Sequence, residues 1–523
     1  MRHSIADSPW SRAALLLGLV ACSNSTRSAS GDLPGAELPA AGDVPTAPVL
    51  VPPIPRVPAP AAESVPPVPG PPADSGAAPP RFADPTLYVA AAGSDTGDGS
   101  AAAPFATIQH ALDVRASGQI SVGPGTYHER LVIPAAPRDA STPLLLSARP
   151  GAIVTSAGAK RTPTDDLIYL EGASFVRIDG FTLVGGDPVS DASGIRVYGS
   201  GEQIALVNNE ISGLRGDSAM GITIYGSDGS GVSDLLIDNN QIHDCQPAPS
   251  EALVINGNVR SYQISHNLVR DVNNIGIDVV AGETWLSKAL PGAGALIGNE
   301  VIRANSNYDG SAAGIYVDGA SNVVVEKNRV SESDFGIEIG AENSGIQATN
   351  VVVRDNFVHR NYRGGIIFGG YDKDRGRVVS SLFVHNSLYQ NARPGEKTAQ
   401  GFAGEQNGEL IAQFSSGCSA QNNIFYGATG ADELVAYWGE GSVRVDRNLY
   451  YPQSSGLLAD DADLMIDDPG FVDPGSGDLH LASSSPAVHA GRGLAAASTT
   501  DIDGEPRDPL TPALGADEVL VVP

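Results

Sequence analysis

The feature that most constrains the fold of this chain is a short motif that returns nine times. Each copy is an asparagine, any residue and an apolar residue, and it follows a run usually rich in Val, Ile or Leu. Successive copies are 25 to 37 residues apart. They are Asn209, Asn240, Asn267, Asn299, Asn328, Asn356, Asn386, Asn423 and Asn448. Periods of 20 to 50 residues are typical of stacked-repeat architectures.

A second short strand is predicted between successive asparagines, and glycine opens most of its copies. These strands start at Gly194, Gly221, Ala252, Gly276, Gly314, Gly336 and Gly365. Each repeat therefore holds two or three β-branched strands separated by Gly, Asn and Asp turns, with no helical period. We predict an all-β chain that folds as a right-handed parallel β-helix. The stacked asparagines would hydrogen-bond along a ladder and serve the structure rather than a ligand.

Composition narrows the classes of function. The chain of 523 residues has 32 Lys and Arg against 60 Asp and Glu, a formal net charge of −28, which disfavours nucleic acid as a partner. The 61 glycines agree with many turns. Three cysteines cannot build a disulfide scaffold. Cys245 and Cys418 should lie about six coils apart, so we expect both to be free and buried.

The first residues read as a targeting segment. An apolar run of nine residues, 13–21, follows Arg12 and is too short to span a bilayer, which takes about 20 residues. It ends in Leu-Val-Ala-Cys at Cys22, which resembles the signal of bacterial lipoproteins. The resemblance implies cleavage after residue 21, lipidation of Cys22 and, with Ser23 next, sorting to the outer membrane or cell surface. The membrane would then be a partner through a lipid anchor only.

Residues 23–83 are rich in Pro, Ala, Gly and Ser, and sixteen of the 38 prolines lie between residues 31 and 80. Proline fixes φ and lacks an amide donor, so we expect an extended, disordered linker. We assign the signal to 1–22, the linker to 23–83, the β-helix to 84–455 and a C-terminal capping module to 456–523. We expect a monomer.

Both ends of the body resemble the bacterial pectate-lyase-like β-helix superfamily. The segments Thr86–Gly99, Ala103–Asp113 and Val122–Ile133 resemble its opening, in which a short helix around 107–114 caps the first coil. Asp468–Gly491, Asp501–Pro509 and Leu514–Glu518 resemble a module that follows many secreted β-helices. The resemblance implies the fold. It leaves the activity open, because the superfamily includes lyases, hydrolases, epimerases and non-enzymatic proteins.

Aligning the second strands predicts two outward columns of side chains. One contains Asp278, Tyr316 and Glu338, and the other contains Tyr198, Tyr225 and Asp318. Asp278 and Asp318 would be diagonal neighbours on adjacent coils, as would Asp318 and Glu338. Like charges at this range repel unless a cation or a shared proton relieves them. We predict an exposed acidic surface and a polysaccharide as the partner.

Two kinds of catalysis fit this surface. In the first, Asp278, Asp318 and Glu338 bind Ca²⁺, which engages an acidic sugar, and Lys288 or a neighbouring basic residue abstracts a proton for β-elimination. In the second, two of the carboxylates are the acid and the base or nucleophile of a hydrolase. Further substrate contacts are predicted from aromatic and basic side chains: Tyr198, Tyr225, Trp285, Tyr316, Arg363, Tyr371 and Arg375.

A non-catalytic alternative stays open. The sequence has no Asp-Pro-His-Asp run as in alginate epimerases, and it lacks the motif set of polygalacturonases. The calcium cluster with a following lysine that is expected of family-nine-like pectate lyases is only partly present, at Asp278. The alternative is therefore a surface β-helix protein that binds glycan or has a structural role without turnover.

Overall fold

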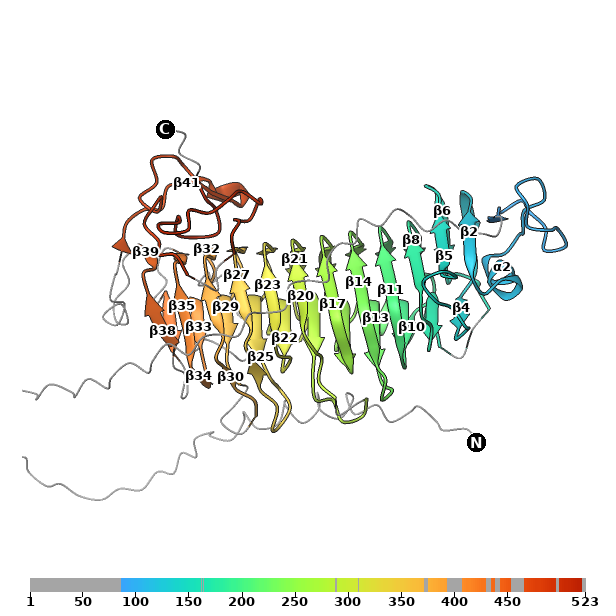
Figure 1. Ribbon diagram of the computed structural model, residues 1–523, viewed down its shortest axis with the longest axis horizontal. Helices are drawn as coiled ribbons and strands as arrows, with labels where there is room; N and C mark the ends of the chain where they lie inside the picture. Colours follow the sequence, from blue (N-terminus) through green and yellow to red (C-terminus); the bar gives the residue numbers. More distant parts are fainter. Residues whose placement is uncertain are drawn as a thin grey trace, which may run out of the picture. The chain divides into compact units, whose positions relative to one another are not determined.

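The computed structural model describes residues 86–519, except 161, 163, 287–288, 309, 371–374, 393–406, 429–433, 438–442, 453–464 and 495–497. Cys22, Lys288 and Tyr371 lie outside the described residues. In the described residues the chain winds into a parallel β-solenoid of about eleven coils (Figure 1). The predicted fold class is confirmed.

Three long parallel sheets form the walls of the solenoid, and each complete coil visits them in the same order. Sheet 1 contains β1 (Leu87–Val89), β2 (Gly118–Val122), β5 (Leu144–Ala148), β8 (Val176–Asp179), β11 (Gly201–Val207), β14 (Val232–Asp238), β17 (Val259–Ser265), β20 (Gly294–Ile297), β23 (Val323–Glu326), β27 (Val352–Arg354), β31 (Leu382–Val384), β35 (Cys418–Gln421) and β38 (Val443–Asp446).

Sheet 2 follows the asparagine motif in each coil. It contains β3 (Gly125–Tyr127), β6 (Ala152–Thr155), β9 (Thr182–Val184), β12 (Glu210–Ser212), β15 (Gln241–His243), β18 (Leu268–Val272), β21 (Glu300–Ala304), β24 (Arg329–Ser331), β28 (Phe357–His359), β32 (Ser387–Tyr389), β36 (Ile424–Tyr426), β39 (Leu449–Tyr451) and β40 (Met465–Ile466). Its last strand lies within the segment predicted as the C-terminal module.

Sheet 3 is made of the mostly Gly-led strands. It contains β4 (Leu131–Pro134), β7 (Ile168–Glu171), β10 (Val189–Tyr198), β13 (Gly216–Gly226), β16 (Leu253–Gly257), β19 (Ile277–Val280), β22 (Ala313–Asp318), β25 (Phe335–Gly340), β29 (Gly364–Phe368), β33 (Gly408–Ala412) and β37 (Val435–Tyr437). A small parallel sheet joins β26 (Ala348–Thr349), β30 (Val378–Val379) and β34 (Ser415–Ser416), and β41 (Phe471–Asp473) pairs antiparallel with β42 (Asp478–Leu481).

Alternate strand residues point inward and form one continuous apolar core that runs from Leu87 to Tyr450. Small β-branched residues dominate it, because coils of similar size must stack directly on one another. The largest side chains of the core include the stacked rings of Phe368 and Phe383, with centroids 4.2 Å apart.

The asparagine ladder fills the corner between sheets 1 and 2, as predicted. In each step the side-chain oxygen of one asparagine accepts from the backbone and side-chain N–H groups of the asparagine on the preceding coil; for Asn209 and Asn240 both distances are 3.0 Å. The ladder runs without a break to Asn448. Buried turn amides are thereby satisfied.

A second, shorter ladder was not predicted. It lies at the corner between sheets 2 and 3, where Asn361 Oδ1 accepts from the Ser333 N–H and Asn391 Oδ1 accepts from Asn361. The buried Glu409 carboxylate then accepts two hydrogen bonds from Asn391, at 2.9 and 2.6 Å. Because this ladder contains only two asparagines, the sequence shows no repeating pattern that would predict it.

The helix α2 (Ile108–Val114) lies against the first strands and buries Ile108, Ala111 and Leu112, which confirms the predicted cap. Its N-terminus is held from outside: Glu129 accepts from the Ile108 and Gln109 N–H groups, both at 2.9 Å. In the described residues no helix is long and apolar enough to cross a membrane. Cys245 and Cys418 are free and buried, as predicted.

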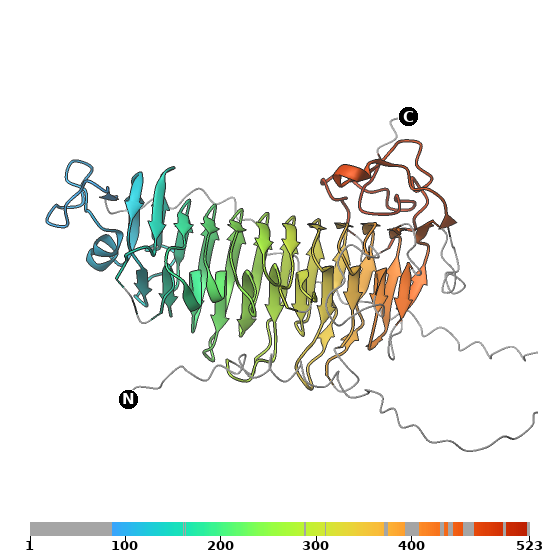
Figure 2. The same cartoon turned by 180° about the vertical axis from the view of Figure 1, so that it is seen from behind.

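The C-terminal segment packs beside the stack of coils, against the outer face of sheet 2 (Figures 1 and 2). It contains β41, the 3₁₀ turn η2 (Pro474–Ser476) and β42. The Arg507 guanidinium reaches the solenoid and donates to Asp355 Oδ1 at 2.7 and 3.1 Å. Leu479, Ile502 and Phe357 share an apolar cluster there.

Candidate functional site

The candidate site lies on the outer face of sheet 3, where the predicted columns form with the predicted register. Asp278 is paired with Tyr316, and Tyr316 is paired with Glu338 on the next coil. Asp318 pairs with Gly340, so it is diagonal to both Asp278 and Glu338. The spacing of adjacent strands places these coils about 4.8 Å apart.

The predicted exposure of these columns is wrong. Asp278 is only 2% exposed, Asp318 is 5% exposed and Tyr316 is 3% exposed, whereas Glu338 is half-buried. The physical reason is a second layer of chain outside the sheet. Strand alternation distinguishes the two faces of a sheet, but it does not reveal what covers the outer one.

The covering layer consists of the turns that follow the strands of sheet 3. Gly282 and Gly319, after β19 and β22, both lie so close to Ile346 in the turn after β25 that a Cβ would come within 2.5 Å of it. The Asn343 side chain of the same turn donates to the Ala281 carbonyl at 3.1 Å. These contacts fix the turns to one another over the acidic residues.

Three acidic residues that the sequence analysis missed join this region. Glu283 and Glu342 lie in the covering turns, and Glu251 lies in the connection just before β16. The Glu342 N–H donates to Asp318 Oδ1 at 2.8 Å. Asn343 Nδ2 also approaches Glu283 Oε1, at 3.5 Å. A signal was available, because Glu283 and Glu342 each follow an Ala-Gly or Gly-Ala pair at the end of a sheet 3 strand.

Six acidic residues lie in this region, and we call them the acidic cluster: Glu251, Asp278, Glu283, Asp318, Glu338 and Glu342. Burial, and then the charges of Glu251, Asp318 and Glu342, raise the pKa of Asp278 well above its usual range. Burial and the Glu342 charge likewise raise the pKa of Asp318. Burial raises the pKa of Glu251 to about 8, and the charges of Glu342 and Glu283 contribute to the rise.

Two oxygens in this region lack a hydrogen-bond partner although they are buried. They are Asp278 Oδ1 and, on the preceding coil, Asn256 Oδ1. Within the described residues, no Arg or Lys forms an ion pair with Asp278 or Asp318. Oxygen ligands of this kind are those that Ca²⁺ prefers. Among the described residues, however, no three carboxylates of the acidic cluster have ligand atoms within 4.8 Å of one another, so they do not form a ready three-ligand ion site.

The predicted aromatic contacts divide into exposed and buried side chains. Trp285, in the turn after β19, is 40% exposed and packs edge to face on Tyr225, with ring centroids 5.4 Å apart. Tyr225 itself is buried, in a cluster that also contains Leu286. Tyr198 is 36% exposed and lies on β10, three coils before β19, on the same face.

The predicted basic contacts are less accessible. Arg363 is buried, with its guanidinium 4.6 Å from the centre of the Phe335 ring and a hydrogen bond to the Gly310 carbonyl at 3.1 Å. It is therefore held by contacts at the starts of the sheet 3 strands, away from the covering turns. Arg375 lies in the turn after β29 and bridges to Ser344, which places it beside the turn of Glu342.

No model of a known protein family matches the sequence. The fold is similar to that of the pectate lyase Pel9A, with a TM-score of 0.49 and 14% identity over 83% of this chain and 96% of that chain. It is also similar to XylC in its complex with xylose, with a TM-score of 0.49 and 11% identity over 83% of this chain and 98% of that chain.

The sequence comparison gives a nearer relative. The uncharacterized protein YwoF of Bacillus subtilis (strain 168) is 30% identical over 334 residues, which are 59% of this chain and 69% of YwoF. This identity extends over more than two thirds of the relative. The chain belongs to the same protein family as YwoF.

Proposed function

We propose that the acidic cluster binds an acidic polysaccharide with the help of Ca²⁺ and cleaves it by β-elimination. The observation that carries the proposal is the burial of Asp278, whose Oδ1 has no partner and whose neighbours are carboxylates. Burying like charges together destabilises a protein unless something offsets them. A function that needs those charges explains why they are there.

When bound, Ca²⁺ would offset the carboxylate charges and attract the carboxylate of a uronic acid. The same ion explains how a chain with a net charge of −28 takes a polyanion, since the two would otherwise repel each other. The exposed ring of Trp285 supplies an apolar plate for one sugar of the bound polymer.

Lys288 is the proposed base. Two residues before it, Leu286 packs with Tyr225 and Val280 on the outer face of sheet 3, and this contact fixes the start of the insertion beside the cluster. The Lys288 amine would take the proton from the carbon next to the uronate carboxylate. The bond from the adjacent carbon to the glycosidic oxygen then breaks, a double bond forms and the released oxygen takes up a proton from water.

A hydrolase is the second candidate, and one observation favours it. The pKa of Glu251 rises to about 8 through burial, so this carboxyl is protonated at neutral pH and could serve as a general acid. In that case a less buried carboxylate such as Glu338 would act as the base.

The deciding experiment incubates the full-length protein with pectic, alginate, glycosaminoglycan and neutral polysaccharides, with Ca²⁺ or with EDTA. Ultraviolet absorbance of an unsaturated product, lost in EDTA and in Asp278→Asn, would support the lyase. Reducing ends without that absorbance would support the hydrolase. The matched control is Asp217→Asn, an exposed position on β13 of the same sheet. Binding without turnover would leave a glycan-binding protein.

A second part of the proposal concerns location. The Cys22 signal and the Pro-rich stretch after it support a lipid anchor with a spacer, which would hold the solenoid at a membrane surface. Incorporation of labelled palmitate into the wild type, and release of Cys22→Ser into the soluble fraction, would be the expected result. Unlabelled wild-type protein would overturn it.

A further inference from the structure

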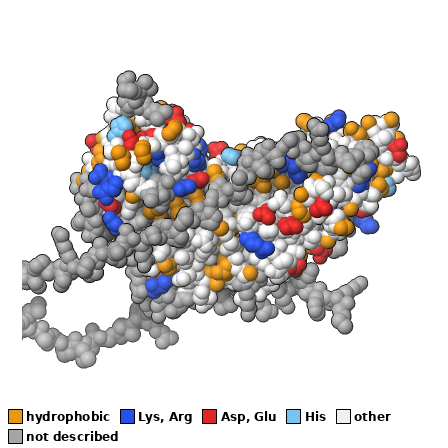
Figure 3. Space-filling view, in the orientation of Figure 1, with side chains coloured by type: hydrophobic (Ala, Val, Ile, Leu, Met, Phe, Trp, Pro, Cys, Tyr) orange, Lys and Arg blue, Asp and Glu red, His pale blue; other side chains and the backbone are white. Residues whose placement is uncertain are grey.

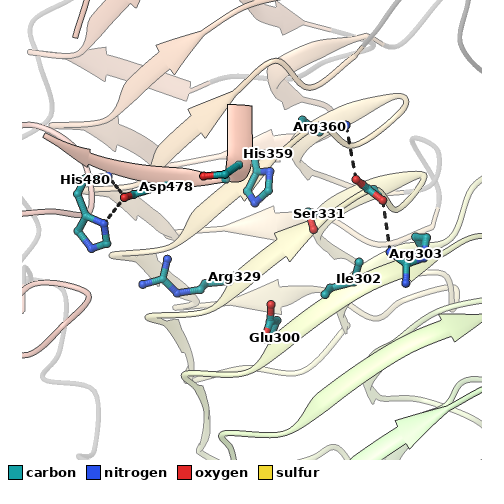
Figure 4. Close-up of a pocket in the computed structure, with 12 residues that line it drawn as sticks. Glu300, Ile302, Arg303, Arg329, Ser331, His359, Arg360, Asp478 and His480 are labelled. Carbon is teal, nitrogen blue, oxygen red and sulfur yellow. Dashed lines mark hydrogen bonds and ion pairs between the residues drawn. The ribbon is translucent and has the colours of Figure 1, made fainter. Parts of the chain in front are cut away.

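A polar cleft lies on a different wall of the molecule from the acidic cluster. It is bounded by sheet 2 strands β21, β24 and β28 on one side and by η2 and β42 of the C-terminal segment on the other (Figure 4). Its volume is about 460 Å³, within the range typical of small-molecule sites. The C-terminal segment therefore forms one wall of a cleft.

The floor of the cleft is set by the register of three coils. Glu300 is paired with Arg329 in one column, and Ile302, Ser331 and His359 form the next column. These columns extend over two strand spacings, about 10 Å, which matches the length of a disaccharide. Figure 4 shows the Glu300 carboxylate and the Ser331 hydroxyl directed toward the same space.

Three polar groups of this floor have no protein partner. Within the described residues, the Glu300 carboxylate and the Ser331 hydroxyl form no hydrogen bond or ion pair. His359 Nδ1 is buried and unpartnered. Burial lowers the pKa of His359 to about 4, so the ring is neutral and offers one donor and one acceptor. Glu300 is exposed and Ser331 lines the cleft, so their polar atoms are open to a ligand, whereas His359 Nδ1 is sealed within the floor.

The guanidinium groups around the floor are engaged to different degrees. Arg303 and Arg360 both pair with Glu332, at 3.5 and 3.6 Å, and form a rim that is already satisfied. Arg329 stacks over the Phe357 ring at 4.6 Å and reaches Asp503 only at 3.5 Å. The ring contact fixes the plane of Arg329, so its remaining donors are held at the cleft.

The wall of the cleft formed by the C-terminal segment is held by side-chain contacts and lies close to the floor. His480 contacts Asp478 through Nδ1 and Asp503 through Nε2, at 2.6 Å for the latter, which ties β42 to the following loop. Gly477 has φ of 89° and approaches the His359 ring so closely that a Cβ would lie 2.7 Å from it. Only glycine fits this position without strain.

We propose that this cleft is a second glycan site, which binds one or two neutral sugar residues. Sugar hydroxyls are donors and acceptors at once, and the floor offers both: Arg329 donates, Glu300 accepts, and Ser331 and His359 can do either. An anion would be repelled by Glu300 and Asp478, which disfavours phosphate, sulfate and uronate. The Ile302 side chain would contact the apolar face of a ring.

The test uses the full-length protein and a set of neutral disaccharides: lactose, maltose, cellobiose, xylobiose and mannobiose. Saturation-transfer NMR identifies a binder and calorimetry gives its affinity. The double variant Glu300→Gln, Ser331→Ala should weaken binding about tenfold or more. The matched control is Glu210→Gln, Ser212→Ala, because these residues occupy the same two columns of sheet 2 three coils or more away, outside the cleft.

The outcomes separate this site from the acidic cluster. Binding that survives in Asp278→Asn and is lost in the Glu300, Ser331 variant supports the proposal, whatever the polysaccharide assay shows. Equal binding by the two double variants would overturn it, and so would binding of galacturonate dimers or inorganic sulfate that survives in Asp278→Asn and is lost in the Glu300, Ser331 variant. Silence across the whole set would also overturn it.

Discussion

Two regions of the outer surface bury charged groups in opposite ways. Where the C-terminal segment meets sheet 2, Arg507 lies between Asp355 and Glu518, and all three side chains are at most 3% exposed. On sheet 3, by contrast, the acidic cluster buries carboxylates near one another, and burial together with their charges raises the pKa values of Glu251, Asp278 and Asp318. The first arrangement is expected of a structural interface, in which each charge has a partner. The second is destabilising by itself, and such sites are often functional.

Figure 3 shows a related contrast on one face of the molecule. Basic side chains lie on and beside the C-terminal segment, and several Asp and Glu side chains lie together over the middle coils. Arg444 of β38 and Arg492 of the C-terminal segment both reach Asp446, at 3.0 and 3.3 Å. Basic residues are scarce in this chain, and many of them are used where the C-terminal segment docks.

The largest expected effect tests the paired region. Arg507→Ala should lower the free energy of unfolding by about 3–5 kcal/mol, because Asp355 and Glu518 would stay buried without their partner. Denaturant titration measures this change. The control is Arg177→Ala, whose exposed pair with Asp179 at 3.0 Å should contribute at most about 1 kcal/mol. Equal losses in the two variants would break the comparison.

The acidic cluster, in contrast, should destabilise the folded protein as the pH rises. Glu251 has a pKa of about 8 in the folded protein against 4.5 ordinarily, so the folded state binds more protons than the unfolded state. The stabilisation of the folded state by the protonated Glu251 carboxyl is complete below pH 4.5 and is lost as the pH rises to about 8. We expect a decline of a few kcal/mol in unfolding free energy over this range.

Other buried acids also titrate in this pH range, so the effect of the acidic cluster is measured as the difference between a variant and the wild type. Asp278→Asn removes one charge from the cluster and should reduce the pH dependence between pH 5 and 8 relative to wild type, by about 1–2 kcal/mol. Thermal unfolding in metal-free buffer at several pH values measures it. Identical slopes for Asp278→Asn and wild type would mean that the carboxylates do not interact.

Calcium should relieve the same repulsion. At 100 times its dissociation constant, a ligand that binds only the folded state stabilises it by about 2.7 kcal/mol. We expect Ca²⁺ to raise the melting temperature of wild type at pH 8 and to have no effect on an Asp278→Asn, Asp318→Asn double variant. An equal shift in both proteins would place the ion elsewhere.

The smallest effect concerns the aromatic plate. Trp285→Ala should weaken polysaccharide binding about tenfold, or ~1.4 kcal/mol, through lost contact area. The control in the same insertion is Leu290→Ala, since Leu290 is 41% exposed and is outside the apolar cluster around Tyr225. Trp285→Ala with unchanged affinity would remove this residue from the site.

The sequence predicted the register of the site but not its environment. Asp278, Tyr316 and Glu338 fall on neighbouring coils because a parallel stack of equal repeats keeps equivalent residues aligned. Glu251, Glu283 and Glu342 were missed because turns between strands have no fixed period. Their approach to Asp278 depends on how each turn folds over the sheet.

What the sequence by itself determined is the solenoid: its strands, its asparagine ladder, its helical cap and the columns of side chains on each wall. Repetition makes this possible, because each coil contacts only its neighbours and the period repeats every contact. Only the tertiary structure decided which columns are covered, which acids meet and where a cleft forms. Arg507 and Asp355 are 152 residues apart, and such a contact follows from packing rather than from any period in the chain.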